Sequence, residues 1–358
     1  MRRSVKLAAV VLSGSLGIAS LAACGAKSTD NTTTSAGASG SSLKVGMAYD
    51  IGGRGDQSFN DSAARGLDKA KTSLGVQVNE AEAKQGESDA DKEARLNSLV
   101  TAGFNPVIAV GFVYQSAVEK VAKANPNVKF AIIDSASDTQ PSNVTSLTFS
   151  EQEGSFLAGV AAASKTKYKQ VGFIGGVQTE LIKKFEAGYR AGVQSVDPSI
   201  KVDVKYLTTP PDFTGFADPA KGKSAAQGML DNKDDVIYTA AGSSGSGAIE
   251  AVATDTANKN AWAIGVDSDQ ASQPALSKYK DHILTSMVKN VDTAVYTFIN
   301  SIKTGSPLTG VKNFDLKQGG VSLATTGGHI DDIKAKLDEA TSKITSGATV
   351  VPTAPPAG

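Results

Sequence analysis

The segment Lys44–Leu74 has the sequence KVGMAYDIGGRGDQSFNDSAARGLDKAKTSL, and it decides the fold that we predict. Its first residues, Lys44–Ala48, are mostly apolar and indicate a buried strand. A glycine-rich loop, Asp50–Asn60, follows the strand. The segment Asp61–Leu74 then places apolar side chains three and four residues apart, as in a helix: Ala64, Leu67, Ala70 and Leu74. A strand, a tight loop and a helix in this order are typical of α/β folds.

The same alternation continues along the chain. Further apolar runs predict strands at Val76–Ala81, Pro106–Val110, Lys129–Ile133, Val144–Phe149, Gln170–Ile174, Lys201–Tyr206, Asp235–Thr239, Ala261–Val266 and His282–Met287. Helical patterns lie between them, at Asp89–Ala102, Gln115–Ala124, Glu151–Lys165, Leu181–Ser195, Ala220–Leu230, Gly247–Ala257 and Val291–Thr304. About ten strands are more than one strongly twisted open sheet usually carries. We therefore predict two doubly wound, Rossmann-like α/β lobes joined by a hinge, with a ligand cleft at the carboxyl ends of their strands.

Cys24 is the only cysteine in the chain and follows a short apolar run, Leu7–Leu21, that basic residues precede. This pattern predicts a signal peptide over residues 1–23. The ending Leu21-Ala22-Ala23-Cys24 resembles a bacterial lipoprotein signal, which implies lipidation of Cys24. With that thiol used, disulfides, zinc–thiolate sites and cysteine nucleophiles are excluded. Residues 24–42 are rich in Ser, Thr and Gly and predict a flexible tether.

Charge and histidine content exclude several classes of function. The whole chain has 36 basic and 36 acidic residues, and residues 1–23 hold three of the basic ones, which leaves 33 against 36. A near-neutral domain predicts no nucleic-acid partner and no polybasic membrane contact. His282 and His329 are the only histidines and lie in no recognisable nucleophile or metal motif, so we expect no catalytic residue, metal or cofactor. Gly242–Gly247 lacks a dinucleotide-binding fingerprint, because Glu250 stands where its last glycine belongs.

Polar and glycine residues follow the predicted strands at their carboxyl ends. They are Asp50–Asn60, Gly111-Phe112, Asp134, Gly242–Gly247, Asp267–Gln270 and Lys289-Asn290. One such cluster would be ordinary loop chemistry. Several at the same edge of parallel sheets predict a single polar cleft.

Several motifs, in order and at family spacing, resemble the basic membrane protein family of lipoproteins, the PnrA-like nucleoside-binding components of ABC transporters. The motifs are Asp50…Asp56-Gln57-Ser58-Phe59-Asn60…Gly66, Phe173–Gly176, Phe185–Gly192, Phe216–Lys223, Ala241–Gly247 and Ile264–Gln270. The resemblance covers roughly Lys44–Val351. It implies a periplasmic-binding-protein fold of type I, a nucleoside ligand of the purine kind, an ABC permease as partner, and a lipid anchor on the extracytoplasmic face of the cell membrane.

The resemblance also implies roles for individual residues. Asp50 would contact the edge of the base, and Phe59 and Phe216 would sandwich its ring. Asp267 would bind the ribose hydroxyls, with Lys289 beside it. Two further cleft positions and one ambiguous residue complete the predicted site: Asp134 and Gly242, and Asn60, which either bonds to the base or caps the following helix. Arg54-Gly55 departs from the apolar or acidic residues that the family usually has there.

Some alternatives and boundaries stay open at this point. A sugar or autoinducer-type ligand, or a tethered sensor in place of a transport component, fits the same fold. We expect one lobe to contain residues 43–149 and 282–308 and the other to contain residues 150–281 and 309–348. The hinge crossings are expected near 149–152, 278–282 and 308–314, and residues 349–358 are expected to be extended or disordered.

Overall fold

The computed structural model describes residues 42–356. The predicted signal peptide, the lipidation of Cys24, nearly all of the predicted tether and the last two residues lie outside this range. The described part belongs to a single compact unit that begins at Ser42. Among these residues, no helix has the length and apolar character that crossing a membrane requires.

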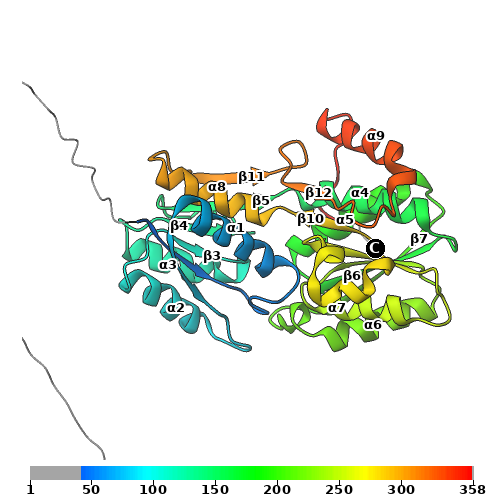
Figure 1. The fold of residues 1–358 in the computed structure, drawn as a ribbon, viewed down its shortest axis with the longest axis horizontal. Coiled ribbons are helices and arrows are strands. Elements are labelled where there is room, and N and C mark those ends of the chain that lie inside the picture. Colours follow the sequence, from blue (N-terminus) through cyan, green and yellow to red (C-terminus); the bar gives the residue numbers. More distant parts are fainter. Residues whose placement is uncertain (1–41, 357–358) are drawn as a thin grey trace, which may run out of the picture. The chain divides into compact units, whose positions relative to one another are not determined.

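The first sheet has six strands, all parallel to their neighbours (Figure 1). In spatial order they are β11 (Gly310–Phe314), β5 (Val144–Phe149), β4 (Phe130–Ile133), β3 (Val107–Ala109), β1 (Lys44–Ala48) and β2 (Gln77–Ala81). The helices of this lobe are α1 (Phe59–Leu74), α2 (Asp89–Thr101), α3 (Gln115–Ala124) and α8 (Val291–Lys303), with the short 3₁₀ helix η1 (Phe112–Tyr114). Strands β1, β3 and β4 are almost wholly buried, as expected for a parallel sheet covered by helices on both faces.

The second sheet also has six strands. In spatial order they are β12 (Val321–Leu323), β10 (Ile283–Lys289), β9 (Trp262–Asp267), β8 (Val236–Ala240), β6 (Gln170–Val177) and β7 (Lys201–Thr208). Only the pairing of β12 with β10 is antiparallel. The α-helices of this lobe are α4 (Glu151–Lys165), α5 (Glu180–Val196), α6 (Pro219–Asp231), α7 (Ser244–Thr254) and α9 (Lys334–Thr345); its 3₁₀ helices are η2 (Thr214–Phe216), η3 (Gln270–Ser272), η4 (Pro274–His282) and η5 (Asp331–Ile333). The predicted fold class, two doubly wound α/β lobes, is confirmed.

The chain passes between the two sheets three times. It leaves the first sheet after Phe149, returns to the first lobe after Lys289, and leaves again after Phe314. These crossings are bonded to each other, since Ser150 N–H donates to Phe314 O at 3.2 Å and Asn290 N–H donates to Gly320 O at 2.9 Å. Three adjacent connections between two lobes are typical of a hinge.

The strand pairing corrects two of the expected lobe boundaries. Residues 282–289 were assigned to the first lobe, but β10 pairs with β9 in the second sheet, so the middle crossing follows Lys289 and not residues 278–282. Residues 309–314 were assigned to the second lobe, but β11 pairs with β5 in the first (Figure 1). Both errors have the same cause. The sheet to which a strand belongs depends on its hydrogen-bonding partners, which can lie far away in the sequence, and local periodicity does not reveal those partners.

Glycines of the quoted motifs allow helices to pack closely. A Cβ on Gly66 of α1 would lie 2.5 Å from Asp292 O of α8, and one on Gly188 of α5 would lie 2.1 Å from Gln152 O of α4. The last described residues, 350–356, form neither helix nor strand. Val351 is nonetheless buried against the core, because its apolar side chain has a partner surface there. This segment was expected to be extended or disordered, and the structure adds that Val351 packs against the core.

Candidate functional site

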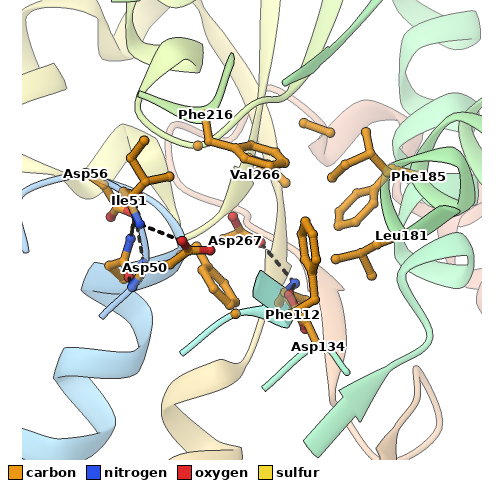
Figure 2. Close-up of a pocket in the computed structure, with 17 residues that line it drawn as sticks. Asp50, Ile51, Asp56, Phe112, Asp134, Leu181, Phe185, Phe216, Val266 and Asp267 are labelled. Carbon is orange, nitrogen blue, oxygen red and sulfur yellow. Dashed lines mark hydrogen bonds and ion pairs between the residues drawn. The ribbon is translucent and has the colours of Figure 1, made fainter. Parts of the chain in front are cut away.

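A cavity of about 560 Å³, including the space open to solvent, lies between the carboxyl ends of the two sheets (Figure 2). All eight predicted cleft residues line this cavity: Asp50, Phe59, Asn60, Asp134, Phe216, Gly242, Asp267 and Lys289. The structure therefore brings together the residues that the sequence singled out, while their roles toward a ligand stay predictions.

Lys289 is the centre of the charged end of the cavity. Its Nζ lies 2.5 Å from Asp134 Oδ2 and 3.7 Å from Asp267 Oδ1, and its side chain is 3% exposed. Burial by itself would lower the pKa of Lys289, but Asp134, Asp267 and Glu151 together raise this pKa above its ordinary value. The ammonium therefore stays protonated and offsets part of a buried negative charge.

Asp134 and Asp267 each keep one carboxylate oxygen without a hydrogen bond. Within residues 42–356, Asp134 Oδ1 and Asp267 Oδ1 are buried and have no hydrogen-bond partner. Both residues have a positive φ, +63° and +62°, which is uncommon outside glycine and costs on the order of 1–3 kcal/mol each. Buried acceptors without partners also cost free energy. Backbone strain and unpaired buried oxygens, as at Asp134 and Asp267, are typical of ligand-binding sites.

Asp267 is also fixed across the cleft. Ser58, in the loop before α1, donates from its Oγ to Asp267 Oδ2 at 2.7 Å, and Ser268 Oγ donates back to Ser58 O at 2.7 Å. Burial raises the pKa of Asp267, although Lys289 and Ser58 act in the opposite direction. These bonds join the first lobe to the second beside the cavity.

Glu151 adds a third carboxylate near Lys289. It is the first residue of α4, directly after the crossing at Ser150, and only 1% of it is exposed. Burial raises the pKa of Glu151 to about 7, against the opposing effects of Lys289 and of Lys184, whose Nζ lies 3.5 Å away. One lysine thus faces three buried carboxyl groups.

The opposite end of the cavity is aromatic. Phe112 of the first lobe meets Phe216 of the second edge to face, with ring centroids 6.5 Å apart and ring planes at 73° (Figure 2). Gly242 gives this end its space, because it has a φ of +56° and a Cβ there would lie 2.8 Å from Phe216 O. The ring of Phe59 lies at the charged end, with its centroid 4.7 Å from Lys289 Nζ. Phe112 is therefore an aromatic partner of Phe216 that the predicted site residues did not include.

Asp50 stands at the aromatic end with one oxygen free of close bonding. Its Oδ1 accepts from Ile51 N–H at 2.6 Å, and its Oδ2 points toward Gly111, where a Cβ would lie 2.4 Å from that oxygen. Within the described part of the chain, no lysine or arginine forms an ion pair with Asp50. Burial raises the pKa of Asp50 to about 7, although the Ile51 N–H and Lys92 lower it.

Asn60 positions Asp50. Its Oδ1 accepts from Asp50 N–H at 3.1 Å, and its Nδ2 donates to Asp56 Oδ2 at 3.0 Å. The predicted choice was between bonding the base and capping α1. Asp56 does the capping instead, because its carboxylate accepts the N–H groups of Ser58, Asn60 and Asp61 at 2.9, 2.8 and 3.1 Å. Asn60 therefore acts as a support for the loop that carries Asp50.

Arg54, the departure from the family pattern, lies outside the cavity. Its guanidinium bonds to Asp68 at 2.8 Å and to Glu80 at 2.6 Å, and so ties the glycine-rich loop to α1 and β2. Phe185 of α5 and Leu181 also line the cavity without having been predicted as site residues. Phe112 lies at a predicted strand end, and Phe185 lies in one of the family motifs. The sequence pattern does not distinguish a phenylalanine that lines a cavity from one in the core.

Comparison with known proteins places these features in a family. The model of the family described as "ABC transporter substrate-binding protein PnrA-like" (Bmp) matches residues 43–354. This chain belongs to the Bmp family of ABC transporter substrate-binding proteins. It is therefore a member of a family of substrate-binding proteins.

Relatives and solved structures agree with this assignment. The chain is 36% identical to the ABC transporter nucleoside-binding protein BmpA of Lactococcus lactis subsp. cremoris, over 98% of this chain and 99% of that protein. It is 33% identical to basic membrane protein A of Borreliella burgdorferi, over 86% and 87% of the two chains. An ABC transporter solute-binding protein from Aeropyrum pernix K1 has the same fold, with a TM-score of 0.75 at 29% identity over 87% of this Bmp chain and 94% of the other.

Proposed function

We propose that this Bmp protein captures purine nucleosides in the cavity between its lobes and delivers them to an ABC importer. The observation that carries the proposal is the division of one cavity into two ends of different chemistry. One end has a lysine between two carboxylates with unbonded oxygens, and the other has aromatic rings beside a single buried carboxyl group. A nucleoside has the same division, with a polyhydroxylated sugar at one end and a flat heterocycle at the other.

The charged end suits the ribose. A cis-diol has two adjacent O–H donors, and the unbonded Oδ1 atoms of Asp134 and Asp267 are two buried acceptors. Lys289 offers N–H donors to a sugar oxygen while it neutralises part of the carboxylate charge. A bound diol would remove the cost of leaving these acceptors unpaired, which makes it a source of affinity.

The aromatic end suits the base. Stacking of a base on an aromatic side chain is worth about 1–3 kcal/mol by alanine substitution. Phe216 and Phe112 come from different lobes, so a ring held against them would favour the closed arrangement of the two lobes. Asp50 is the polar group at this end and would bond to the edge of the base.

The balance of charge favours an uncharged ligand. Lys289 already faces Asp134, Asp267 and Glu151, all buried, and in residues 42–356 no other lysine or arginine lines the cavity. A phosphate group would place further negative charge in this low-dielectric space without a free cation to pair with it. We therefore propose nucleosides, and not nucleotides, as ligands.

The anchoring of the protein is part of the same proposal. The signal resembling that of lipoproteins and the predicted lipidation of Cys24 would hold the binding domain on the extracytoplasmic face of the membrane, beside the permease. Stable anchoring requires more than one acyl chain. The relative in Lactococcus lactis that is named as an ABC transporter nucleoside-binding protein supports the pairing with an importer.

A thermal-unfolding panel tests the ligand class. The purified protein is heated with nucleosides, free bases, ribose, glucose and nucleoside monophosphates, each at the same concentration. A ligand at a hundred times its Kd adds about 2.7 kcal/mol of stability, which shifts the midpoint by several degrees. We expect this shift for purine nucleosides alone. A shift with sugars and none with nucleosides would favour the sugar-binding alternative.

A further inference from the structure

A second cavity lies in the cleft beside the first. It measures about 670 Å³, including space open to solvent, and shares Asp50 and Ile51 with the first cavity. Its remaining lining comes from both lobes. The first lobe contributes the loop after β2, Lys92 of α2 and Val113, and the second contributes Pro211–Thr214. We call it the outer cavity, and the cavity with Lys289 the inner cavity.

An aromatic boundary separates the two cavities. Phe112 meets Phe216, which lines the inner cavity, and also Phe213, which lines the outer one, with ring centroids 5.9 Å apart. Asp50 and Ile51 form the other side of this boundary. Any group that extends from the inner cavity past Asp50 therefore enters the outer one.

The lining of the outer cavity is apolar where the two lobes face each other. Ala83 and Val113 of the first lobe face the cavity, as do Pro211 and Phe213 of the second. Of its three carboxylates, Asp50 is shared with the inner cavity and the other two are already hydrogen-bonded. Glu87 accepts from Arg95 NH1 at 2.9 Å, and Asp212 accepts from Thr214 N–H at 2.9 Å.

The charged side chains of the outer cavity nearly balance one another. Lys92 pairs with Asp89 at 3.0 Å, while Lys84, within residues 42–356, forms no ion pair. Both lysines face the cavity. With Asp50, Glu87 and Asp212 opposite them, the lining has no excess of positive charge, and a neutral apolar group fits it better than an ion of either sign.

We propose that the outer cavity is a subsite for a substituent on the base, and that this protein binds purine nucleosides whose base carries an apolar arm on the edge that faces Asp50. The inference rests on the proposed function, because it needs the base at the aromatic end of the inner cavity. N6-benzyladenosine is a ligand of this class. Its ribose and purine occupy the inner cavity, and its benzyl group lies in the outer cavity among Val113, Pro211 and Phe213.

Binding of adenosine and N6-benzyladenosine to the full protein tests the proposal. The affinity for the two ligands is measured by titration calorimetry, and we expect the Kd values to agree within about three-fold. The variant Ala83→Trp places a large side chain in the outer cavity and should weaken N6-benzyladenosine by about 100-fold through steric conflict, while adenosine changes by less than about three-fold. Ala90→Trp, at an exposed position of α2 outside the cavity, is the matched control and should change neither.

A second variant and the association rate of adenosine distinguish a subsite from an entry route. Val113→Trp fills the same space from another element and should repeat the selective loss, with the unfolding midpoint reporting whether the fold is kept. If the outer cavity is only an entry route, both variants slow the association of adenosine and affect the two ligands equally, and the proposal is wrong. It is also wrong if N6-benzyladenosine binds the unmodified protein more than about ten-fold less tightly than adenosine. Failure of every nucleoside to bind would instead overturn the proposed function and this inference with it.

Discussion

The ammonium of Lys289, at the end of β10, lies 2.5 Å from the carboxylate of Asp134, which follows β4 of the other sheet. This ion pair joins the two lobes at the inner end of the cleft, and both side chains are less than 5% exposed. Asp267 of the second lobe completes the group at 3.7 Å. The pair therefore serves two purposes, since it fixes the lobes next to the crossing at Asn290 and directs carboxylate oxygens into the cavity.

Removal of the lysine alone should destabilise the protein. In Lys289→Met the carboxyl groups of Asp134, Asp267 and Glu151 lose their buried counter-charge, and breaking such a pair costs about 3–5 kcal/mol. The free energy of unfolding in urea at pH 7.5 measures this loss. The double variant Lys289→Met/Asp134→Asn removes one of the orphaned charges and should recover part of the stability. A single variant as stable as the unmodified protein would contradict the role given to this ion pair.

Asp267→Asn should reduce nucleoside affinity without unfolding the protein. The amide keeps an oxygen that can accept from Ser58, but it replaces one carboxylate acceptor of the proposed diol site with a donor. Hydrogen bonds to charged groups contribute about 1.5–3 kcal/mol, so we expect affinity to fall by about ten- to 100-fold with little change in the unfolding midpoint. Unchanged affinity would remove Asp267 from the site.

The effect of an aromatic residue on adenosine affinity should depend on which cavity the residue lines. Phe216→Ala and Phe112→Ala each remove a ring from the aromatic end where the base is proposed to lie, and we expect each to weaken adenosine by about 1–3 kcal/mol. Phe213→Ala is the matched control, because Phe213 contacts Phe112 as Phe216 does but lines only the outer cavity. Calorimetric Kd values for the three variants give the comparison. An equal loss in all three would mean that the aromatic cluster is structural.

The protonation of Asp50 should affect the choice of base. Burial, together with Glu87 and Asp134, raises the pKa of this carboxyl group to about 7, against the Ile51 N–H and Lys92, which lower it. Ionised Asp50 only accepts hydrogen bonds, which suits the ring N–H of inosine, whereas the protonated form donates, which suits the bare ring nitrogen of adenosine. The affinity for inosine relative to adenosine should therefore rise between pH 6 and pH 8. Asp50→Asn should make this ratio independent of pH, and a ratio that stays constant in the unmodified protein would contradict the prediction.

Asp234, far from the cavity at the start of β8, should make stability depend on pH. It is fully buried, neither of its oxygens has a hydrogen-bond partner within residues 42–356, and burial raises its pKa to about 7. Between its ordinary pKa near 4 and 7, the folded protein holds a proton that the unfolded chain releases, so stability falls as pH rises through this range. Asp234→Asn should therefore stabilise the protein at pH 8 by about 1–2 kcal/mol and have little effect at pH 4. An equal effect at the two values would contradict this account.

The fold could be read from the sequence because its strands are short apolar runs separated by amphipathic helices. The bounds of β1 and β5 were predicted to the residue, and those of the other strands up to β10 within a few residues. No strand or helix was predicted after residue 304, because β11 and α9 are largely exposed and their sequences lack a continuous apolar face. Assignment of β10 to the wrong lobe has a different cause, since its partners lie elsewhere in the sequence.

The part of the cavity that strand ends form could be predicted from the sequence. Asp50 and Asp134 follow strands, and Asp267 and Lys289 end them; positions at the carboxyl ends of parallel strands converge. Phe112 was not separable from a core residue, because only its contact with Phe216 of the other lobe gives it a function. The capping of α1 by Asp56 was also missed, since its carboxylate bonds to the helix from two residues before the N-cap position.

Titration calorimetry with adenosine, adenine, ribose, glucose and adenosine monophosphate shows which of these compounds the inner cavity binds. If the inner cavity holds base and ribose together and excludes phosphate, adenosine binds with a stoichiometry of one, and each of the other compounds binds at least about 100-fold more weakly. Tight binding of glucose or ribose without a response to any nucleoside, or binding of the monophosphate as tight as that of adenosine, would contradict the proposed function.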